Sequence, residues 1–388
     1  MDSVQVTQEL GETAAVPAMD SGFGVVDLHC HPTMISYTFG PRFWKAHNPP
    51  LWWCPWSMRV DFDALAAGGV KAFLCTTYVY EKELFADVWP LRAVAALYPR
   101  GRHIVATPVD QLTREYLDFA ENMVAETRRL RGDVIETARS FDDMKRVTGA
   151  GRICMLHAIE GAHHLNGDIG MVDELAARGV CLMVVPHMYP NEAGGCVNVL
   201  SKYRMPGCFN AKYQDASGMT PWGRELIEKL LDVGILVDAT HGTFEFRKQT
   251  LEIVRNHPKR RPMVMSHACI TGDDSTEFGP TRAEIGQIAD TGGVIGMMMF
   301  TSREKSQHRT PAIDYVLNGI DLLVRYGGED VVAIGSDFDG TTDVAEDMRS
   351  PRDYRALREA MLRKYTEDQV AKFTYGNAER ALKNGWGK

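Results

Sequence analysis

Short apolar runs alternate with amphipathic helical patterns along most of this chain. Eight runs are expected to be strands, because each is almost continuously apolar and is bounded by turn residues. They are Phe23–Leu28, Val70–Thr76, Ile153–Ile159, Val180–Val185, Ile235–Ala239, Met263–Ser266, Val294–Met299 and Val331–Gly335. Helical patterns between them include Trp222–Leu231, Glu245–Asn256, Arg282–Ala289 and Ile313–Arg325.

The alternation predicts a parallel sheet that is buried on both faces. Glycines that are typical of helix ends, such as Gly179 and Gly234, precede several of the strands. Eight strand–helix units fit an α/β fold, a single (β/α)8 TIM barrel with long loops over its C-terminal mouth. A doubly wound sheet is the alternative, but no Gly-x-Gly-x-x-Gly follows the first strand. We expect a flexible tail over residues 1–21 and one barrel domain over residues 22–388.

Two segments are longer than a minimal barrel needs. Residues 34–58 follow the first strand and are expected to form an aromatic-rich loop, and a second loop spans Met188–Met219. The aromatic residues of the first segment are Tyr37, Phe39, Phe43, Trp44, Trp52, Trp53 and Trp56. In a barrel both segments would lie over the mouth, where active sites form. The aromatic segment is expected to line a substrate site, to form a small satellite core, or both.

Composition and charge narrow the classes of partner. The net charge of −8 argues against nucleic acid or an anionic membrane surface, and no apolar run is long enough to span a bilayer. The first 20 residues lack the basic start and apolar centre of a secretion signal. Eight scattered cysteines without a Cys-x-x-Cys pair favour a reduced, cytoplasmic setting.

Metal-ligating residue types stand at the C-terminal ends of the predicted strands. They are His29 and His31 after the first strand, Glu160 after the third, His187 after the fourth, His241 after the fifth, His267 after the sixth and Asp337 after the eighth. Buried imidazoles and carboxylates are costly unless something pairs with them. Because the strand ends of a barrel meet at one mouth, we expect these side chains to share bound cations.

Counting ligands predicts two divalent ions. His29, His31 and Asp337 would hold one ion, and His241 and His267 the other. Glu160 would bridge them with its two oxygens. Nitrogen and oxygen ligands without thiolate suit Zn²⁺, with Mn²⁺ or Fe²⁺ as alternatives.

Two such ions, about 3.5–4 Å apart, share a hydroxide and polarise a carbonyl in metal-dependent hydrolysis. Asp337 is then the expected base. His187 is expected to donate a hydrogen bond to the oxyanion. Tyr78, just after the second strand, is a further candidate for contacting the substrate.

At these residues the chain resembles the membrane (renal) dipeptidase family, peptidase family M19, a branch of the amidohydrolase-like hydrolases. The resemblance covers roughly residues 23 to 385. Its motifs include Ala158-Ile159-Glu160-Gly161, Gly218-Met219-Thr220-Pro221-Trp222-Gly223, Ile235-Leu236-Val237-Asp238-Ala239-Thr240-His241, Ser266-His267 and Gly335-Ser336-Asp337-Phe338-Asp339-Gly340. The resemblance implies a barrel with two zinc ions, the ligand and acid/base roles given above, dipeptide substrates and a homodimer.

The chain departs from the family pattern at two places. The first strand ends in His29-Cys30-His31, where the family usually has His-x-Asp. The arginine of an Arg-Asn pair that grips the substrate carboxylate falls near Phe278 by spacing, and Arg282 lies about one helical turn later. A bidentate arginine is a strong determinant of carboxylate recognition. Arg282 is therefore a candidate substrate contact, and whether it replaces the family's arginine stays open.

Four functions are consistent with the sequence. The first is a binuclear dipeptidase-like hydrolase that cleaves a dipeptide or similar small amide. The second uses the same site on a non-peptide substrate, such as a lactone, a cyclic amide or an N-acyl compound. The third is a mononuclear metal-dependent decarboxylase. The fourth is a binding protein that has lost catalysis, which a full ligand set disfavours.

Overall fold

The computed structural model describes residues 23–47, 57–197, 218–274, 277–299, 311–341 and 345–387. Its described strands are β1 (Val25–Cys30), β2 (Val70–Thr77), β3 (Ile135–Thr137), β4 (Ile153–Glu160), β5 (Val180–Val184), β6 (Leu236–Asp238), β7 (Met263–Ala268), β8 (Val294–Met297) and β9 (Val332–Ile334). All except β3 form a closed parallel ring, because β2 pairs with β4 and β9 pairs back with β1. The predicted (β/α)8 barrel is confirmed. The doubly wound alternative is wrong, because the sheet closes on itself.

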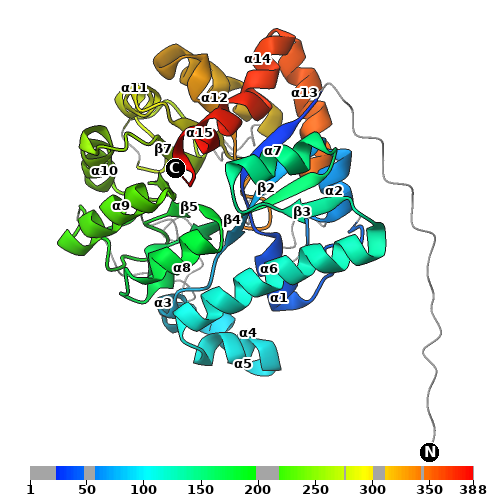
Figure 1. The fold of residues 1–388 in the computed structure, drawn as a ribbon, viewed down its shortest axis with the longest axis vertical. Coiled ribbons are helices and arrows are strands. Elements are labelled where there is room, and N and C mark those ends of the chain that lie inside the picture. Colours follow the sequence, from blue (N-terminus) through cyan, green and yellow to red (C-terminus); the bar gives the residue numbers. More distant parts are fainter. Residues whose placement is uncertain are drawn as a thin grey trace, which may run out of the picture.

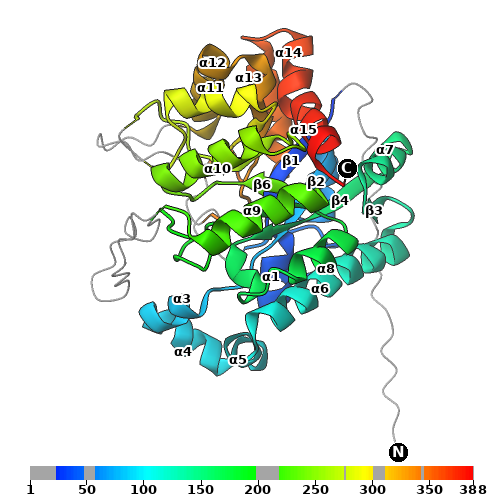
Figure 2. The ribbon, with the colours of Figure 1, turned by 60° about the vertical axis from the view of Figure 1, so that its left-hand side comes forward.

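Helices surround this ring (Figure 1). They are α1 (Pro32–Phe39), α2 (Phe62–Ala67), α3 (Lys82–Asp87), α4 (Trp89–Leu97), α5 (Pro99–Ala106), α6 (Val109–Arg131), α7 (Phe141–Gly149), α8 (Met171–Ala177), α9 (Pro221–Val233), α10 (Phe244–Asn256), α11 (Arg282–Asp290), α12 (Ala312–Gly327), α13 (Tyr354–Leu362), α14 (Glu367–Ala371) and α15 (Asn377–Gly385). Helices α3, α4 and α5 follow β2 and project from the edge of the barrel in Figures 1 and 2.

The strand that the sequence did not predict is β3. It has three residues and pairs only with the start of β4, while β5 pairs with the later residues of the same strand. Of its residues only Ile135 is buried. A segment this short has no measurable periodicity, so its pairing depends on the neighbouring strand rather than on its own sequence.

Apolar residues from all eight barrel strands meet in one cluster, which therefore fills the barrel interior. The strand members are Val26, Leu28, Ala72, Leu74, Cys154, Leu156, Ala158, Cys181, Leu182, Val184, Leu236, Val264, Val294 and Ala333. Leu382 of α15 and Trp386, just after it, join this cluster. A Cβ added to Gly385 would lie 2.1 Å from Leu236 Cδ2. The end of α15 thus closes the end of the barrel where the strands begin, and the functional residues gather at the opposite end.

The barrel closes between its first and last strands at a seam with few backbone pairs. Within β1 and β9 the only register pair is Asp27 with Ile334. The buried Asp27 carboxylate adds to this seam. It accepts hydrogen bonds from the backbone N–H of Ser336 (2.9 Å), from the Ser336 hydroxyl (2.7 Å) and from the Tyr354 hydroxyl (2.6 Å). A buried side-chain network therefore takes over where the ladder is short.

The aromatic-rich segment is not entirely the loop that the sequence predicts. Residues 34–39 lie in α1, which begins at Pro32 and is capped by Gly40, whose φ of 87° suits a glycine. Phe43 is buried and its ring stacks on Phe73, with ring centroids 6.2 Å apart. This part of the segment therefore belongs to the core. Trp52, Trp53 and Trp56 lie outside the described residues, as do the expected tail over residues 1–21 and residues 198–217 of the second loop.

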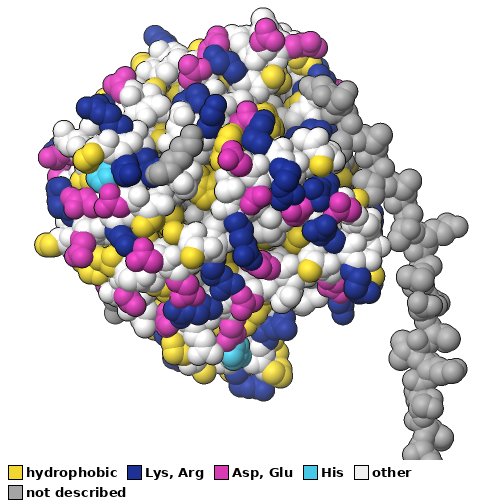
Figure 3. Space-filling view, in the orientation of Figure 1, with side chains coloured by type: hydrophobic (Ala, Val, Ile, Leu, Met, Phe, Trp, Pro, Cys, Tyr) yellow, Lys and Arg dark blue, Asp and Glu magenta, His cyan; other side chains and the backbone are white. Residues whose placement is uncertain are grey.

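The surface carries charges of both signs. On the face seen in Figure 3, basic and acidic side chains are interspersed. Among the described helices, none combines the length and the apolar character that crossing a membrane requires. The six described cysteines are free thiols.

Candidate metal centre

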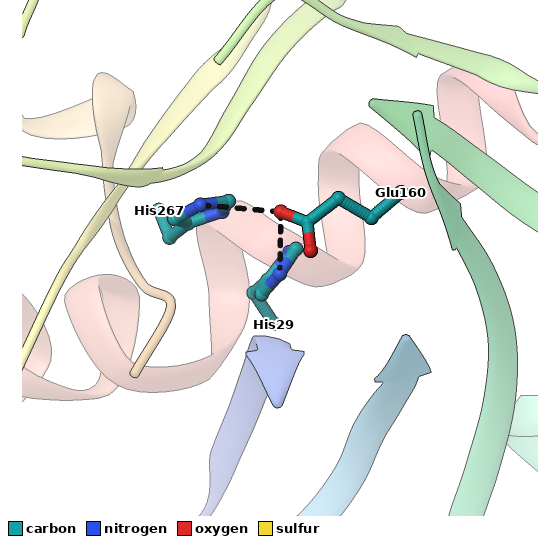
Figure 4. A group of neighbouring side chains, drawn as sticks. All are labelled: His29, Glu160 and His267. Carbon is teal, nitrogen blue, oxygen red and sulfur yellow. Dashed lines mark ion pairs between the residues drawn. The ribbon is translucent and has the colours of Figure 1, made fainter. Parts of the chain in front are cut away.

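Glu160, the last residue of β4, lies among histidines from the ends of other strands. Its Oε1 is 3.2 Å from Nε2 of His29 and 3.5 Å from Nε2 of both His241 and His267. His241 Nε2 and His267 Nε2 are 2.9 Å apart. Figure 4 shows the carboxylate facing the imidazoles of His29 and His267. Three strand ends that are far apart in the sequence thus direct ring nitrogens at one carboxylate oxygen.

The other oxygen of Glu160 faces a second set of side chains. Its Oε2 is 3.3 Å from Nε2 of His31 and 3.4 Å from Nε2 of His187. Asp337 Oδ1 is 3.3 Å from His31 Nε2. The structure therefore brings together all six residues that the sequence predicts as metal ligands, and His187 with them.

The ligand atoms fall into three overlapping groups that have the spacing of a metal site. One contains the predicted first set, His29, His31 and Asp337. The residues of the predicted second set are divided, because Glu160 groups with His29 and His267 and also with His187 and His241. Glu160 is common to the last two groups.

The donor atoms fit a metal such as zinc. The Nε2 atoms of His29 and His31 are 2.9 Å apart, and so are those of His241 and His267. Imidazole nitrogens this close to one another around a carboxylate are typical of a site where a bound cation lies between them. Cys30 lies between His29 and His31 in sequence, but its thiol contacts the carbonyl of Leu74 at 3.5 Å. The site therefore offers nitrogen and oxygen atoms, as predicted.

Two of these residues have a strained backbone. His241 has a φ of 67° and Asp337 a φ of 56°, which is the left-handed region that non-glycine residues rarely adopt. The Asp337 backbone is held by neighbours, since its N–H donates to the carbonyl of His29 at 2.9 Å and its carbonyl accepts from the N–H of Gly340 at 3.1 Å. Strain that is held in this way is common at functional sites.

The side chains of Asp337 and His31 occupy the space that a side chain at Gly340 would fill. A Cβ at this position would lie 2.1 Å from Asp337 Oδ1 and 2.4 Å from His31 Cδ2. We expect Gly340→Ala to displace both side chains and to lower kcat/KM by about 10–100-fold, because small displacements of reacting groups are costly. Steady-state kinetics and metal content measure this effect. The matched control is Gly149→Ala, because a Cβ there has no atom within 4 Å. Equal activity of the two variants would contradict the prediction.

One hydroxyl orients two of the histidines. Ser266 Oγ is 2.9 Å from His29 Nδ1 and 3.1 Å from His267 Nδ1. When each imidazole keeps its Nδ1 proton, both donate to this oxygen and each Nε2 lone pair is free for a ligand. Asp238 fixes the serine by accepting its backbone N–H at 3.0 Å. The sequence placed Ser266 next to His267 but gave no sign that it also reaches the first strand.

We expect Ser266→Ala to weaken metal binding by about 10–100-fold, the usual cost of losing a partner behind a ligand. Titration of the metal-free protein with Zn²⁺ measures this change. Ser36→Ala is a suitable control, since Ser36 is also buried and, among the described residues, its hydroxyl has a single contact, with Met58 Sδ at 3.7 Å. Unchanged zinc affinity of Ser266→Ala would exclude the orienting role.

The protonation of the centre follows from burial and charge. Burial acts to raise the pKa of Glu160, but the charges of neighbouring histidines, His187 and His29 first, hold it well below its usual value. Glu160 is therefore a carboxylate. Burial and then the charge of His29 hold the pKa of His267 well below its usual value. Its imidazole is therefore neutral, the form that binds a metal.

A buried carboxylate that the sequence did not single out, Glu81, lies behind His187. Its Oε1 is 2.8 Å from His187 Nδ1, and its Oε2 accepts a hydrogen bond from the Tyr78 hydroxyl at 2.5 Å. Burial acts to raise the pKa of Glu81, but the charges of His187 and His163 outweigh it and lower the pKa to about 2. Burial acts to lower the pKa of His187, and the charges of Glu160 and Glu81 outweigh it and raise the pKa to about 9. Glu81 lies four residues after the apolar strand β2, so its sequence signal is a carboxylate shortly after a buried strand, as at the other strand ends.

The other two predicted substrate contacts occupy different places. The ring of Tyr78 packs against His187, with ring centroids 4.6 Å apart, so Tyr78 lies beside the centre. Arg282 begins α11, where its guanidinium donates to the carbonyl of Gly272 at 2.7 Å and lies over the ring of Tyr326. The structure therefore brings Tyr78 to the group around Glu160 but does not bring Arg282 there.

The arginine that contacts the residues on either side of Phe278 is Arg247, not Arg282. Arg247 of α10 is buried and forms an ion pair with Glu284 at 2.8 Å. It also donates to the carbonyls of Glu277 (3.0 Å) and Gly279 (3.4 Å), on either side of Phe278. Arg247 therefore holds the segment between β7 and α11 in place.

Comparisons with known proteins identify the family of the chain. The model of the membrane dipeptidase family (peptidase family M19) matches residues 16–385. An uncharacterized Klebsiella pneumoniae protein from the pqqA 5′ region is 25% identical over 285 residues, which are 72% of this chain and 97% of that protein.

Solved structures share the fold. One is dipeptidase AC, a metallopeptidase of family M19, with a TM-score of 0.72, 19% identity and coverage of 95% of this chain and 100% of that chain. Another is a Rhodobacter sphaeroides metallopeptidase, liganded with a phosphinate mimic of the dipeptide L-Ala-D-Ala. Its TM-score is 0.70 at 19% identity, with coverage of 94% of this chain and 100% of that chain.

Proposed function

Because the chain belongs to the membrane dipeptidase family (peptidase family M19) and is a metal-dependent hydrolase, we propose that it cleaves the amide bond of a dipeptide, or of a similarly small amide, at the centre around Glu160. The observation that carries this proposal is the position of Glu160, whose two oxygens each face a separate set of imidazole nitrogens within 3.5 Å. Family membership favours this reaction over the non-peptide and decarboxylase alternatives.

Two divalent ions, Zn²⁺ before Mn²⁺ or Fe²⁺, are the cofactor of this proposal. His29, His31 and Asp337 would hold one, His241 and His267 the other, and Glu160 both. When bound, such ions polarise the substrate carbonyl and make an attacking water more acidic.

The remaining steps belong to side chains of the chain. Asp337 takes the proton of the attacking water on its carboxylate and passes it to the leaving amine, as general base and then general acid. His187 donates its Nε2–H to the oxygen that becomes negative at the scissile carbon. Tyr78 packs against the His187 ring and forms one wall beside it.

The test is metal content per chain, measured on the same sample as hydrolysis of a panel of L,L and L,D dipeptides that includes L-Ala-D-Ala. Two metals with turnover support the proposal. Two metals without turnover retain the hydrolase and reject the dipeptide, so amides and lactones without a free carboxylate would be assayed next. One metal or fewer, after reconstitution with Zn²⁺ and Mn²⁺, rejects the bridging role of Glu160.

We also propose that the enzyme is a homodimer and acts in the cytoplasm. Six free cysteines in the described part of the chain support a reducing compartment. The large exposed apolar side chains on the described elements are mainly those of α4, Trp89, Val94 and Leu97, with exposed fractions of 57%, 46% and 81%. A second copy that packs there would bury them. Light scattering of the full chain measures the oligomeric state.

A further inference from the structure

The buried Glu81 carboxylate has contacts on both of its oxygens at the edge of the centre. Oε1 faces the Nδ1 atom of His187 at 2.8 Å and accepts the backbone N–H of Met188 at 3.3 Å. Oε2 accepts the Tyr78 hydroxyl at 2.5 Å. Glu81 is 3% exposed, and Tyr78 and His187 are each 5% exposed. A buried carboxylate with this many donors is a fixed point for the side chains around it.

His187 lies between two carboxylates on opposite sides of its ring. Nδ1 faces Glu81, and Nε2 faces Glu160 Oε2 at 3.4 Å. An acceptor at Nδ1 keeps a proton on that nitrogen and sets the direction of the ring plane. Nε2 is then directed toward Glu160. The Tyr78 ring limits rotation of the imidazole from the side.

We propose that Glu81 is a positioning residue, which acts through His187 and Tyr78 to fix the side of the centre that receives the substrate carbonyl. This inference rests on the proposed function for its reaction, but the geometry of Glu81 and His187 holds for any substrate. Glu81 touches neither the metal ligands nor the substrate in this assignment. Its effect on turnover therefore has to pass through its two partners.

The experiment is a double-mutant cycle of Glu81→Ala and His187→Ala, with kcat, KM and metal content measured for each variant. We expect Glu81→Ala to lower kcat by about 10–100-fold with unchanged metal content, and the double variant to be no slower than His187→Ala alone. Glu81→Gln, which keeps the size of the side chain, is expected to recover part of the loss. The matched control is Glu83→Gln, an exposed glutamate in the first turn of α3, with unchanged kcat.

Two outcomes of the cycle would overturn the inference. Losses that multiply in the double variant would mean that Glu81 does not act through His187. A loss of bound metal in Glu81→Ala would mean that it supports a ligand instead.

A second readout separates this inference from the proposed function. The His187 imidazole signals, observed by ¹⁵N-histidine NMR and assigned with His187→Ala, report whether Nδ1 carries a proton. We expect the Nδ1–H signal in the parent protein and its loss or shift in Glu81→Ala. If the parent protein binds metal but hydrolyses no dipeptide, the proposed function fails and the NMR result still decides the role of Glu81. An unchanged signal in Glu81→Ala overturns the inference.

Discussion

Glu160→Gln is expected to lose metal from the whole centre and to lower kcat/KM by at least about 10³-fold. An amide presents one oxygen and one NH₂ group, so it can face only one of the two sets of imidazoles with an acceptor. If the NH₂ group replaces Oε1, the Nε2 atoms of His29, His241 and His267 lose the carboxylate oxygen that lies within 3.5 Å of them. If it replaces Oε2, His31 and His187 lose theirs and keep only their second carboxylates, Asp337 and Glu81. Both ions should therefore bind more weakly, not only one.

Metal analysis after dialysis, together with dipeptide kinetics, measures this change. Glu228→Gln, an exposed position on α9, is the control for loss of a glutamate charge. If Glu160→Gln kept its full metal content, the carboxylate would not bridge the two ions. Retention of half the metal would place Glu160 on one ion alone.

Asp337→Asn is expected to lower kcat by about 10²–10⁴-fold with a much smaller change in KM, because the amide cannot accept the proton of the attacking water. The substitution suits the backbone, since asparagine adopts the left-handed region readily and the φ of Asp337 is 56°. The amide oxygen can still face His31, where the carboxylate Oδ1 lies at 3.3 Å. The change therefore removes the base and disturbs the fold little.

Kinetics at saturating metal concentration separate loss of the base from loss of a ligand. A variant that recovers full turnover when Zn²⁺ is added would show that Asp337 only binds metal. Turnover that is unaffected at every metal concentration would remove Asp337 from the mechanism.

The sequence predicted the barrel because its buried parallel strands are continuous apolar runs that need no partner to be recognised. All eight barrel strands were found in this way. The three-residue β3 was missed because it has no pattern of its own. Helix α1 was missed because its eight residues run directly into an aromatic- and proline-rich segment that has no helical period. Local pattern identifies an element only when the element is long enough to show a period.

That these histidines and carboxylates lie together was predictable, because polar residues after apolar strands are rare and costly to bury. The residues that orient these side chains were harder to predict. Ser266 orients His29 across 237 residues of sequence, and Glu81 reaches His187 across 106. Such partners depend on which strands become neighbours in the barrel and on the register between them. The sequence of one strand specifies neither the neighbour nor the register.

The group of His29, His31 and Asp337, a candidate metal site, spans the seam between β1 and β9 and therefore exists only in the closed barrel. His29 and His31 lie on one side of the seam and Asp337 on the other, joined by the hydrogen bond from the Asp337 N–H to the carbonyl of His29 at 2.9 Å. Contacts across more than 300 residues carry the largest loop-closure entropy in this chain, so they should form late in folding. Metal capture by this group would then report the moment at which the two ends of the barrel meet, and added Zn²⁺ would stabilise the closed ring over an open one.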